Sequence, residues 1–170
     1  MNLLDYVRDI QDFPKKGIVF KDITPLIKDS DAFKHSIELL ENKLQDIDFD
    51  YIVAVESRGF IFGAALALQM GKGIIPVRKK GKLPAETISI QYDLEYGTDS
   101  LELHKDALMK TDKVIIIDDL LATGGTVSAV EKLIAQTGAE IVADVFVVNL
   151  AFLNGIKKLS AKKVIQLLEF

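Results

Sequence analysis

The chain has 170 residues, of which 49% are hydrophobic and 27% are charged, as is typical of one globular domain. It contains no cysteine, which excludes disulfides, thiolate metal sites and cysteine nucleophiles. The formal net charge of −4 argues against a general nucleic-acid binder or membrane-surface binder. No apolar run approaches the ~20 residues of a membrane span, and the N-terminal segment does not read as a secretory signal. We therefore expect a cytoplasmic protein with a single domain over residues 1–170.

Helical and strand patterns alternate along most of the chain. Apolar residues at helical spacing predict helices after the capping residues 29–31, over residues 59–70, and from about residue 125 to Gly138. Short runs that are apolar on both faces predict strands over residues 51–55, 73–77, 114–117, 141–148 and 164–168. Such strands, separated by helices, indicate a parallel sheet that is covered on both faces. The sequence therefore predicts an α/β fold with an open, mainly parallel sheet.

Residues 78–109 interrupt this alternation. The segment is polar and charged, and residues 87–92 alternate between apolar and polar as a hairpin strand does. An excursion of this length inside an α/β domain is usually a functional flap or a small added sheet. Both alternatives remain open from the sequence.

The segment VIIIDDLLATGGT, residues 114–126, carries the clearest chemical signal. A buried strand is followed by Asp118 and Asp119, by a loop of small residues, and by the start of a helix. Ligands of open α/β sheets bind at the carboxyl ends of strands, and free N–H groups at a helix start suit a phosphate. The loop has no lysine, so it is not a nucleoside-triphosphate loop, and carboxylates beside a phosphate suit ribose hydroxyls. The acidic pair alone, or the glycine loop alone, could be no more than a solvated strand end or a common turn. The whole arrangement of strand, acidic pair, loop and helix favours a ribose phosphate site.

Four segments of the chain resemble type I phosphoribosyltransferases, which use phosphoribosyl diphosphate (PRPP). They cover nearly the whole length and are FPKKGIVFKDITPLIKD, VAVESRGFIFG, VRKKGKLPAETISIQYDLEYG and DDLLATGGT. The last is similar to the form found in family members that act on adenine. The resemblance implies a purine salvage homodimer that converts adenine and PRPP to AMP and pyrophosphate through an oxocarbenium-like transition state. It implies Mg²⁺ bound mainly through substrate and waters, rather than by a protein-made metal site.

The resemblance also assigns residues to the parts of PRPP. Asp118 and Asp119 would bind the ribose hydroxyls. The 5′-phosphate would lie on the loop of Ala122, Thr123, Gly124, Gly125 and Thr126. The pyrophosphate would be held by Glu56, Ser57, Arg58, Arg78, Lys79 and Lys82. Arg58 suits this role because its guanidinium can hold a phosphate with two hydrogen bonds. The resemblance also implies a cis peptide bond between Glu56 and Ser57.

Two further segments are implied to complete the site. A small N-terminal hood, about residues 1–30, would bind the base, with Val19 and Lys21 reading its edge through their backbones. Phe20 and Leu121 would sandwich the adenine ring. Glu95, in the flexible loop within about residues 78–109, would act as the acid or base for the purine. Neither His35 nor His104 is assigned a role.

Two other functions remain open from the sequence. One is the same chemistry with another base, such as xanthine, hypoxanthine or uracil, which the PRPP motif does not decide. The other is a non-catalytic regulator that senses PRPP. A regulator would need a nucleic-acid-binding surface, which the acidic charge disfavours, and 170 residues leave no space for a helix-turn-helix extension.

Overall fold

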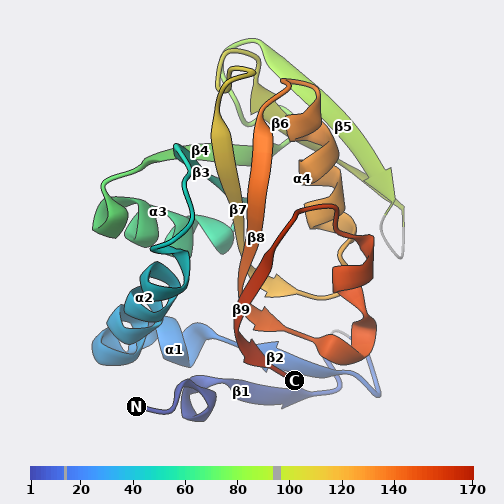
Figure 1. Ribbon diagram of the computed structural model, residues 1–170. Helices are drawn as coiled ribbons and strands as arrows, with labels where there is room; N and C mark the ends of the chain where they lie inside the picture. The colour runs from blue at the N-terminus through green and yellow to red at the C-terminus, as the bar shows by residue number, and fades with distance from the viewer. Residues whose placement is uncertain (14, 94–96) are drawn as a thin grey trace.

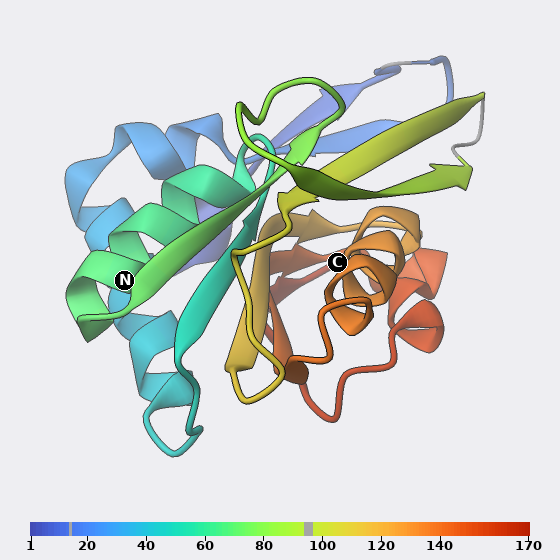
Figure 2. The ribbon, with the colours of Figure 1, turned by 90° about the horizontal axis from the view of Figure 1, so that it is seen from above.

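The computed structural model describes residues 1–13, 15–93 and 97–170. A seven-stranded sheet separates helices α1, α2 and α3 on one face from α4 on the other (Figure 1). A two-stranded sheet made by the N-terminal residues lies beyond one end of it (Figures 1 and 2). The predicted α/β fold with a mainly parallel sheet is confirmed.

The main sheet has the strand order β5-β6-β4-β3-β7-β8-β9. Its strands are β3 (Tyr51–Val55), β4 (Gly73–Lys79), β5 (Thr87–Asp93), β6 (Thr98–His104), β7 (Lys113–Leu121), β8 (Glu140–Asn149) and β9 (Val164–Glu169). The pairs β4–β3, β3–β7, β7–β8 and β8–β9 are parallel. Strand β6 pairs antiparallel with both β4 and β5. The excursion is therefore a hairpin added to the edge of the main sheet. It joins the sheet where Arg78 and Lys79 pair with Glu102 and Leu101.

The helices begin and end where local residues dictate. They are α1 (Thr24–Lys28), α2 (Ser30–Leu44), α3 (Gly59–Met70), α4 (Gly125–Ala135) and the 3₁₀ helices η1 (Leu3–Tyr6), η2 (Ala151–Leu153) and η3 (Gly155–Lys158). Asp29 begins α2 because its Oδ1 accepts hydrogen bonds from the amides of Asp31 and Ala32 at 3.1 and 2.9 Å. Gly71 ends α3 with a φ of 63°, a conformation that favours glycine. No helix in the described part of the chain is long and apolar enough to cross a membrane.

Strand β7 divides the core into two clusters. Ile115 and Ile117 pack on one face with α2 and α3, while Val114 and Ile116 pack on the other with α4. All four are fully buried. The strand is longer than predicted and continues through the two aspartates to Leu121. The carboxylates therefore belong to a paired strand rather than to the loop that follows it.

The N-terminal hood is a two-stranded antiparallel sheet of β1 (Arg8–Gln11) and β2 (Val19–Asp22), which sequence reasoning did not predict. Ion pairs join the strands, since Arg8 lies 2.6 Å from Asp22 and Lys21 lies 2.7 Å from Asp9. The Lys21 ammonium also lies 4.2 Å from the centre of the Phe170 ring. The hood is thereby tied to the end of the main sheet.

Two buried carboxyl groups, Asp144 of β8 and Glu131 of α4, lie close together. Asp144 is completely buried, and neither of its oxygens has a hydrogen-bond partner within the described residues. Glu131 is 4% exposed and accepts hydrogen bonds from the amides of Ser160 and Ala161. Burial, followed by the nearby charge of Glu131, raises the pKa of Asp144 from 3.8 to about 8.

This raised pKa predicts a pH-dependent stability. The folded state holds a proton that the unfolded state releases, so stability should fall as the pH rises from about 4 to about 8. At pH 8 the cost should be on the order of a few kcal/mol. Asp144→Asn should therefore raise the melting temperature at pH 8.5 by several degrees and change it little at pH 5. An equal shift at both pH values in thermal unfolding would contradict the assignment.

Candidate active site

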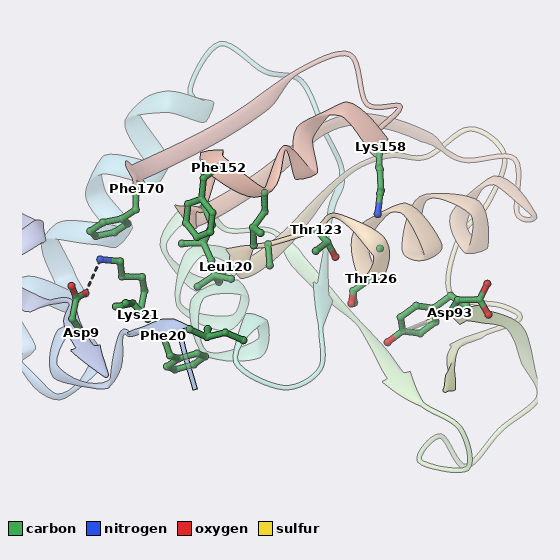
Figure 3. A pocket seen from close by; sticks show the side chains of 18 residues that line it. Asp9, Phe20, Lys21, Asp93, Leu120, Thr123, Thr126, Phe152, Lys158 and Phe170 are labelled. Carbon is green, nitrogen blue, oxygen red and sulfur yellow. Dashed lines mark hydrogen bonds and ion pairs between the residues drawn. The ribbon is translucent and has the colours of Figure 1, made fainter. Parts of the chain in front are cut away.

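Two adjoining cavities open at the carboxyl ends of the parallel strands. The larger is a cleft of about 1120 Å³ between the hood, the loop after β7 and the segment after β8 (Figure 3). The smaller has a volume of about 470 Å³ and shares Tyr92, Leu120 and Thr126 with the cleft. It is also lined by Glu56, Ser57, Arg58, Lys79, Asp99, Leu101, Asp118 and Asp119. Residues from all four of the segments that carry the resemblance therefore meet at one edge of the sheet.

The loop after β7 has the backbone geometry of an anion site. Gly124 has a φ of 78° and directly precedes α4, whose first turn contains Gly125 and Thr126. The first N–H groups of a helix have no partner within the helix and attract anions. Ala122, Thr123, Gly125 and Thr126 line the cleft. A phosphate monoester could bind here by accepting hydrogen bonds from the backbone.

The acidic pair lies next to this loop and is largely buried. Asp119 is 5% exposed, and its backbone amide donates to Oδ1 of Asp118 at 2.8 Å. Burial and the neighbouring Asp119 raise the pKa of Asp118 well above its usual range. Arg58 Nε approaches Oδ2 of Asp119 to 2.6 Å without hydrogen-bond alignment, so this oxygen has no donor among the described residues. Sugar hydroxyls would supply donors to these oxygens.

The loop between β3 and α3 is held against the acidic pair. Its peptide bond between Glu56 and Ser57 is cis, as the resemblance implies. Gly59 starts α3 so close to β7 that a Cβ would lie 2.9 Å from the carbonyl oxygen of Ile117 and 3.0 Å from Asp118 Oδ1. Glycine at this position therefore allows Arg58 to reach the site.

The basic residues of the excursion take different positions. Arg78 donates to both carboxylate oxygens of Glu56 at 3.3 and 3.4 Å and to the carbonyl oxygen of Lys82 at 3.2 Å. Burial opposes ionisation of Glu56, but its hydrogen bonds with the Lys79 amide and with Arg78 lower its pKa. The Lys79 ammonium lines the smaller cavity and pairs with Asp99 at 3.0 Å. Arg78 and Lys82 do not line either cavity.

At the end of the cleft nearest the hood, where the base is expected (the base end), the structure differs from one predicted contact. Val19, Phe20 and Lys21 line it, as expected for the hood (Figure 3). Leu121 is 1% exposed and packs in the core beside α4, whereas Leu120 lines the cleft. The structure therefore does not bring Leu121 into the cleft, and the regular alternation of faces along β7 does not continue to its end, since Leu121 packs in the same cluster as Val114 and Ile116. Leu120 is therefore the candidate partner of Phe20.

Several lining residues were missed by sequence reasoning. They come from the end of β5, the segment after β8 and the chain after β9, and include Tyr92, Phe152, Lys158 and Phe170 (Figure 3). Phe152 follows the carboxyl end of a predicted strand. Ligands of open α/β sheets bind at such strand ends, so Phe152 could have been predicted to line the site. Glu95 lies outside the described residues. Within the described residues, no group of three or more histidine or acidic side chains could hold a metal ion.

Comparisons with known proteins agree with this geometry. The sequence model of the phosphoribosyl transferase domain matches residues 26–165. The chain is 55% identical to the adenine phosphoribosyltransferase of Thermosipho africanus, over 99% of each chain. The crystal structure of that enzyme from Thermoanaerobacter pseudethanolicus is 53% identical, with a TM-score of 0.95 over 99% of this chain and 100% of that one. The Saccharomyces cerevisiae enzyme complexed with adenine and an imino-altritol bisphosphate is 41% identical, with a TM-score of 0.91 over 97% and 96%.

The chain therefore belongs to the phosphoribosyltransferases, a class of transferase enzymes with this fold. Within that class it belongs to the adenine phosphoribosyltransferase family, as the full-length identities show.

Proposed function

We propose that this chain transfers the phosphoribosyl group of PRPP to N9 of adenine, forming AMP and pyrophosphate in purine salvage. The observation that carries the proposal is the continuity of the site. The buried acidic pair leads directly into the phosphate loop, residues 122–126, and the cleft runs from this loop to the hood. A ribose phosphate on the pair and the loop would present its C1 carbon between the base end and the smaller cavity.

The reaction is a displacement at C1 of the ribose. The bond between C1 and the pyrophosphate oxygen breaks as the bond to N9 forms, and positive charge develops on the ring. Asp118 and Asp119 would stabilise this charge and position the sugar. Arg58 and Lys79, which line the smaller cavity, would stabilise the departing pyrophosphate, while the Glu56–Arg78 pair would hold their loops in place.

We propose Mg²⁺ as the divalent cofactor. The donor set fits an ion that takes most ligands from PRPP oxygens and water, because the acidic pair lines the smaller cavity and Oδ2 of Asp119 already pairs with Arg58 at 2.6 Å. Bound there, the ion would neutralise charge on the pyrophosphate. Removal of Mg²⁺ with a chelator should slow AMP formation, and an unchanged rate would contradict this role.

Leu120 is proposed to contact the adenine ring, opposite Phe20. Leu120→Ala should raise KM for adenine about tenfold, because it removes apolar contact from one face of the ring. Leu121→Ala is the matched comparison, since it should instead lower the melting temperature by leaving a core cavity. Steady-state kinetics and thermal unfolding of both variants test the assignment. A raised KM for adenine in Leu121→Ala, with only a lower melting temperature in Leu120→Ala, would identify Leu121 as the base contact.

Glu95 is proposed as the group that takes the ring proton released when N9 bonds to C1. Glu95→Gln should lower kcat about 100-fold, as is usual for loss of general acid–base catalysis. Its KM values should change much less. A wild-type kcat, measured where chemistry limits the rate, would show that another group takes the proton.

The cytoplasm is the proposed location, because charged substrates such as PRPP do not cross membranes unaided. A homodimer is also proposed. Exposed apolar side chains support it, since Leu68 and Ile61 of α3 are 86% and 40% exposed. Sedimentation at micromolar concentration should give twice the mass of one chain, and a monomer would contradict the proposal.

One experiment separates the proposed reaction from its alternatives. The protein is incubated with PRPP, Mg²⁺ and each of adenine, hypoxanthine, xanthine and uracil, and the nucleotide formed is identified. AMP formation from adenine, at a rate at least 100-fold above the other bases, supports the proposal. Faster turnover of another base would replace adenine as the substrate, and PRPP binding without any turnover would favour the regulator.

A further inference from the structure

The segment after β8 packs directly on the backbone of the phosphate loop. A Cβ at Gly124 would overlap the carbonyl oxygen of Gly155, and a Cβ at Gly155 would overlap the carbonyl oxygen of Ala122. Gly155 is buried and is the first residue of η3. The approach requires glycine on both sides, so η3 and the loop are held in one relative position.

Lys158, the last residue of η3, extends into the cleft from this position. Figure 3 shows its amino group pointing toward Thr123 and Thr126 of the phosphate loop. Lys158 makes no hydrogen bond or ion pair with any described residue. The other lysine that lines the cleft, Lys21, pairs with Asp9 at 2.7 Å. Among the described residues, no carboxylate therefore pairs with the Lys158 ammonium at this end of the cleft, although Asp93 also lines it.

The phosphate loop itself offers hydrogen bonds but no formal positive charge. Residues 122–126 contain no lysine or arginine, whereas a phosphate monoester carries nearly two negative charges at neutral pH. Backbone N–H groups orient such an anion, and a nearby ammonium offsets its charge. Lys158 is placed to supply that charge from a segment about 30 residues farther along the chain.

We propose that Lys158 is a further binding residue of this site and that its ammonium pairs with the 5′-phosphate of the bound ribose. This inference rests on the proposed function, because it takes residues 122–126 as the 5′-phosphate site. Gly155 is the positioning residue that fixes η3 on the loop. PRPP and AMP share the 5′-phosphate, so Lys158 strengthens the binding of both. It does not strengthen the binding of pyrophosphate, which lies in the smaller cavity.

Calorimetric titration of Lys158→Gln with ribose 5-phosphate, AMP and pyrophosphate tests the inference. Ribose 5-phosphate and AMP should bind about 5- to 20-fold more weakly than to the wild type, with pyrophosphate unchanged. KM for PRPP should rise by a similar factor, with kcat and KM for adenine within twofold. The loss should be smaller at 0.5 M salt, because Lys158 is exposed and its charge is screened.

Two control variants make the result specific. Lys157→Gln removes the same charge from the same exposed helix, but Lys157 does not line the cleft. It should bind all three ligands as the wild type does. Lys158→Arg should retain most of the affinity for ribose 5-phosphate. Wild-type affinity in Lys158→Gln, or equal losses in Lys157→Gln and Lys158→Gln, would overturn the inference.

Gly155→Ala tests the packing of η3 on the loop. It should weaken ribose 5-phosphate binding at least tenfold and leave pyrophosphate binding unchanged, with the folded fraction checked by thermal unfolding. Wild-type affinity for ribose 5-phosphate would overturn the positioning role. AMP formation by the wild type together with an unaffected Lys158→Gln would reject the inference alone. Absence of AMP formation, with Lys158-dependent binding of ribose 5-phosphate, would reject the proposed reaction alone.

Discussion

Asp119→Asn is expected to lower kcat/KM for PRPP about 100-fold. Asp119 is 5% exposed, and its Oδ2 has no hydrogen-bond donor among the described residues. In the proposed complex this carboxylate accepts from a ribose hydroxyl and faces the positive charge that develops on the ring. A hydrogen bond to a charged group contributes about 1.5–3 kcal/mol, and loss of the charge weakens transition-state stabilisation further.

The same variant should be about as stable as the wild type, because it loses the ion pair between Arg58 and Oδ2 of Asp119 but also loses the repulsion between the two aspartates. Asp118 has a raised pKa because of burial and because the Asp119 carboxylate is adjacent, so the neutral asparagine relieves repulsion. Loss of activity without loss of stability would identify a residue kept for binding and catalysis. Asp112→Asn is the control, since Asp112 is 8% exposed and accepts from the Met109 amide away from both cavities. It should lower the melting temperature and leave kcat/KM unchanged, whereas wild-type turnover in Asp119→Asn would refute the ribose assignment.

Gly124→Ala is expected to lower kcat/KM for PRPP at least 100-fold, mainly by raising KM. The new Cβ would overlap the carbonyl oxygen of Gly155, and the φ of 78° is unfavourable for alanine by about 1–2 kcal/mol. Relief of both requires the loop to move from its contact with η3. The amides that would hold the 5′-phosphate then lose their alignment. The melting temperature should also fall by several degrees.

Gly71→Ala is the control for Gly124→Ala. It separates the effect of backbone strain at a positive φ from the effect of moving the phosphate loop. Gly71 also has a positive φ, of 63°, but nothing lies within 4 Å of its Cβ position and it lies at the end of α3. It should lose about 1 kcal/mol of stability and keep wild-type kinetics. If both variants lost the same stability and neither changed KM for PRPP, the loop would not be the phosphate site.

The parallel strands of the main sheet and helices α2, α3 and α4 could be predicted because their apolar patterns are consistent, whereas β6 and α1 were not predicted. β3 and β7 are buried on both faces, and α2 begins at an aspartate cap. The strands of the hood could not be predicted, because they are short and have no fully buried residue, and ion pairs join β1 to β2.

The parts of the candidate site that are formed by residues adjacent in sequence could be predicted. The parts that are brought together from distant segments could not. The acidic pair and the phosphate loop are contiguous in sequence, so their chemistry can be recognised without a structure. Choosing between Leu120 and Leu121 required the structure, because the alternation of faces along β7 slips near its end: Leu121 packs in the same cluster as Val114 and Ile116. Lys158 and Phe170 reach the cleft only through the topology of β8 and β9, so no local pattern indicated them.

A crystal structure of the protein soaked with ribose 5-phosphate would show whether residues 118–126 hold the sugar and its phosphate. We expect the phosphate within hydrogen-bond distance of the backbone amides of residues 122–126. We expect the 2- and 3-hydroxyls of the ribose on the carboxylates of Asp118 and Asp119. A sugar bound elsewhere, with this loop empty at saturating ligand, would show that residues 118–126 are not the ribose phosphate site.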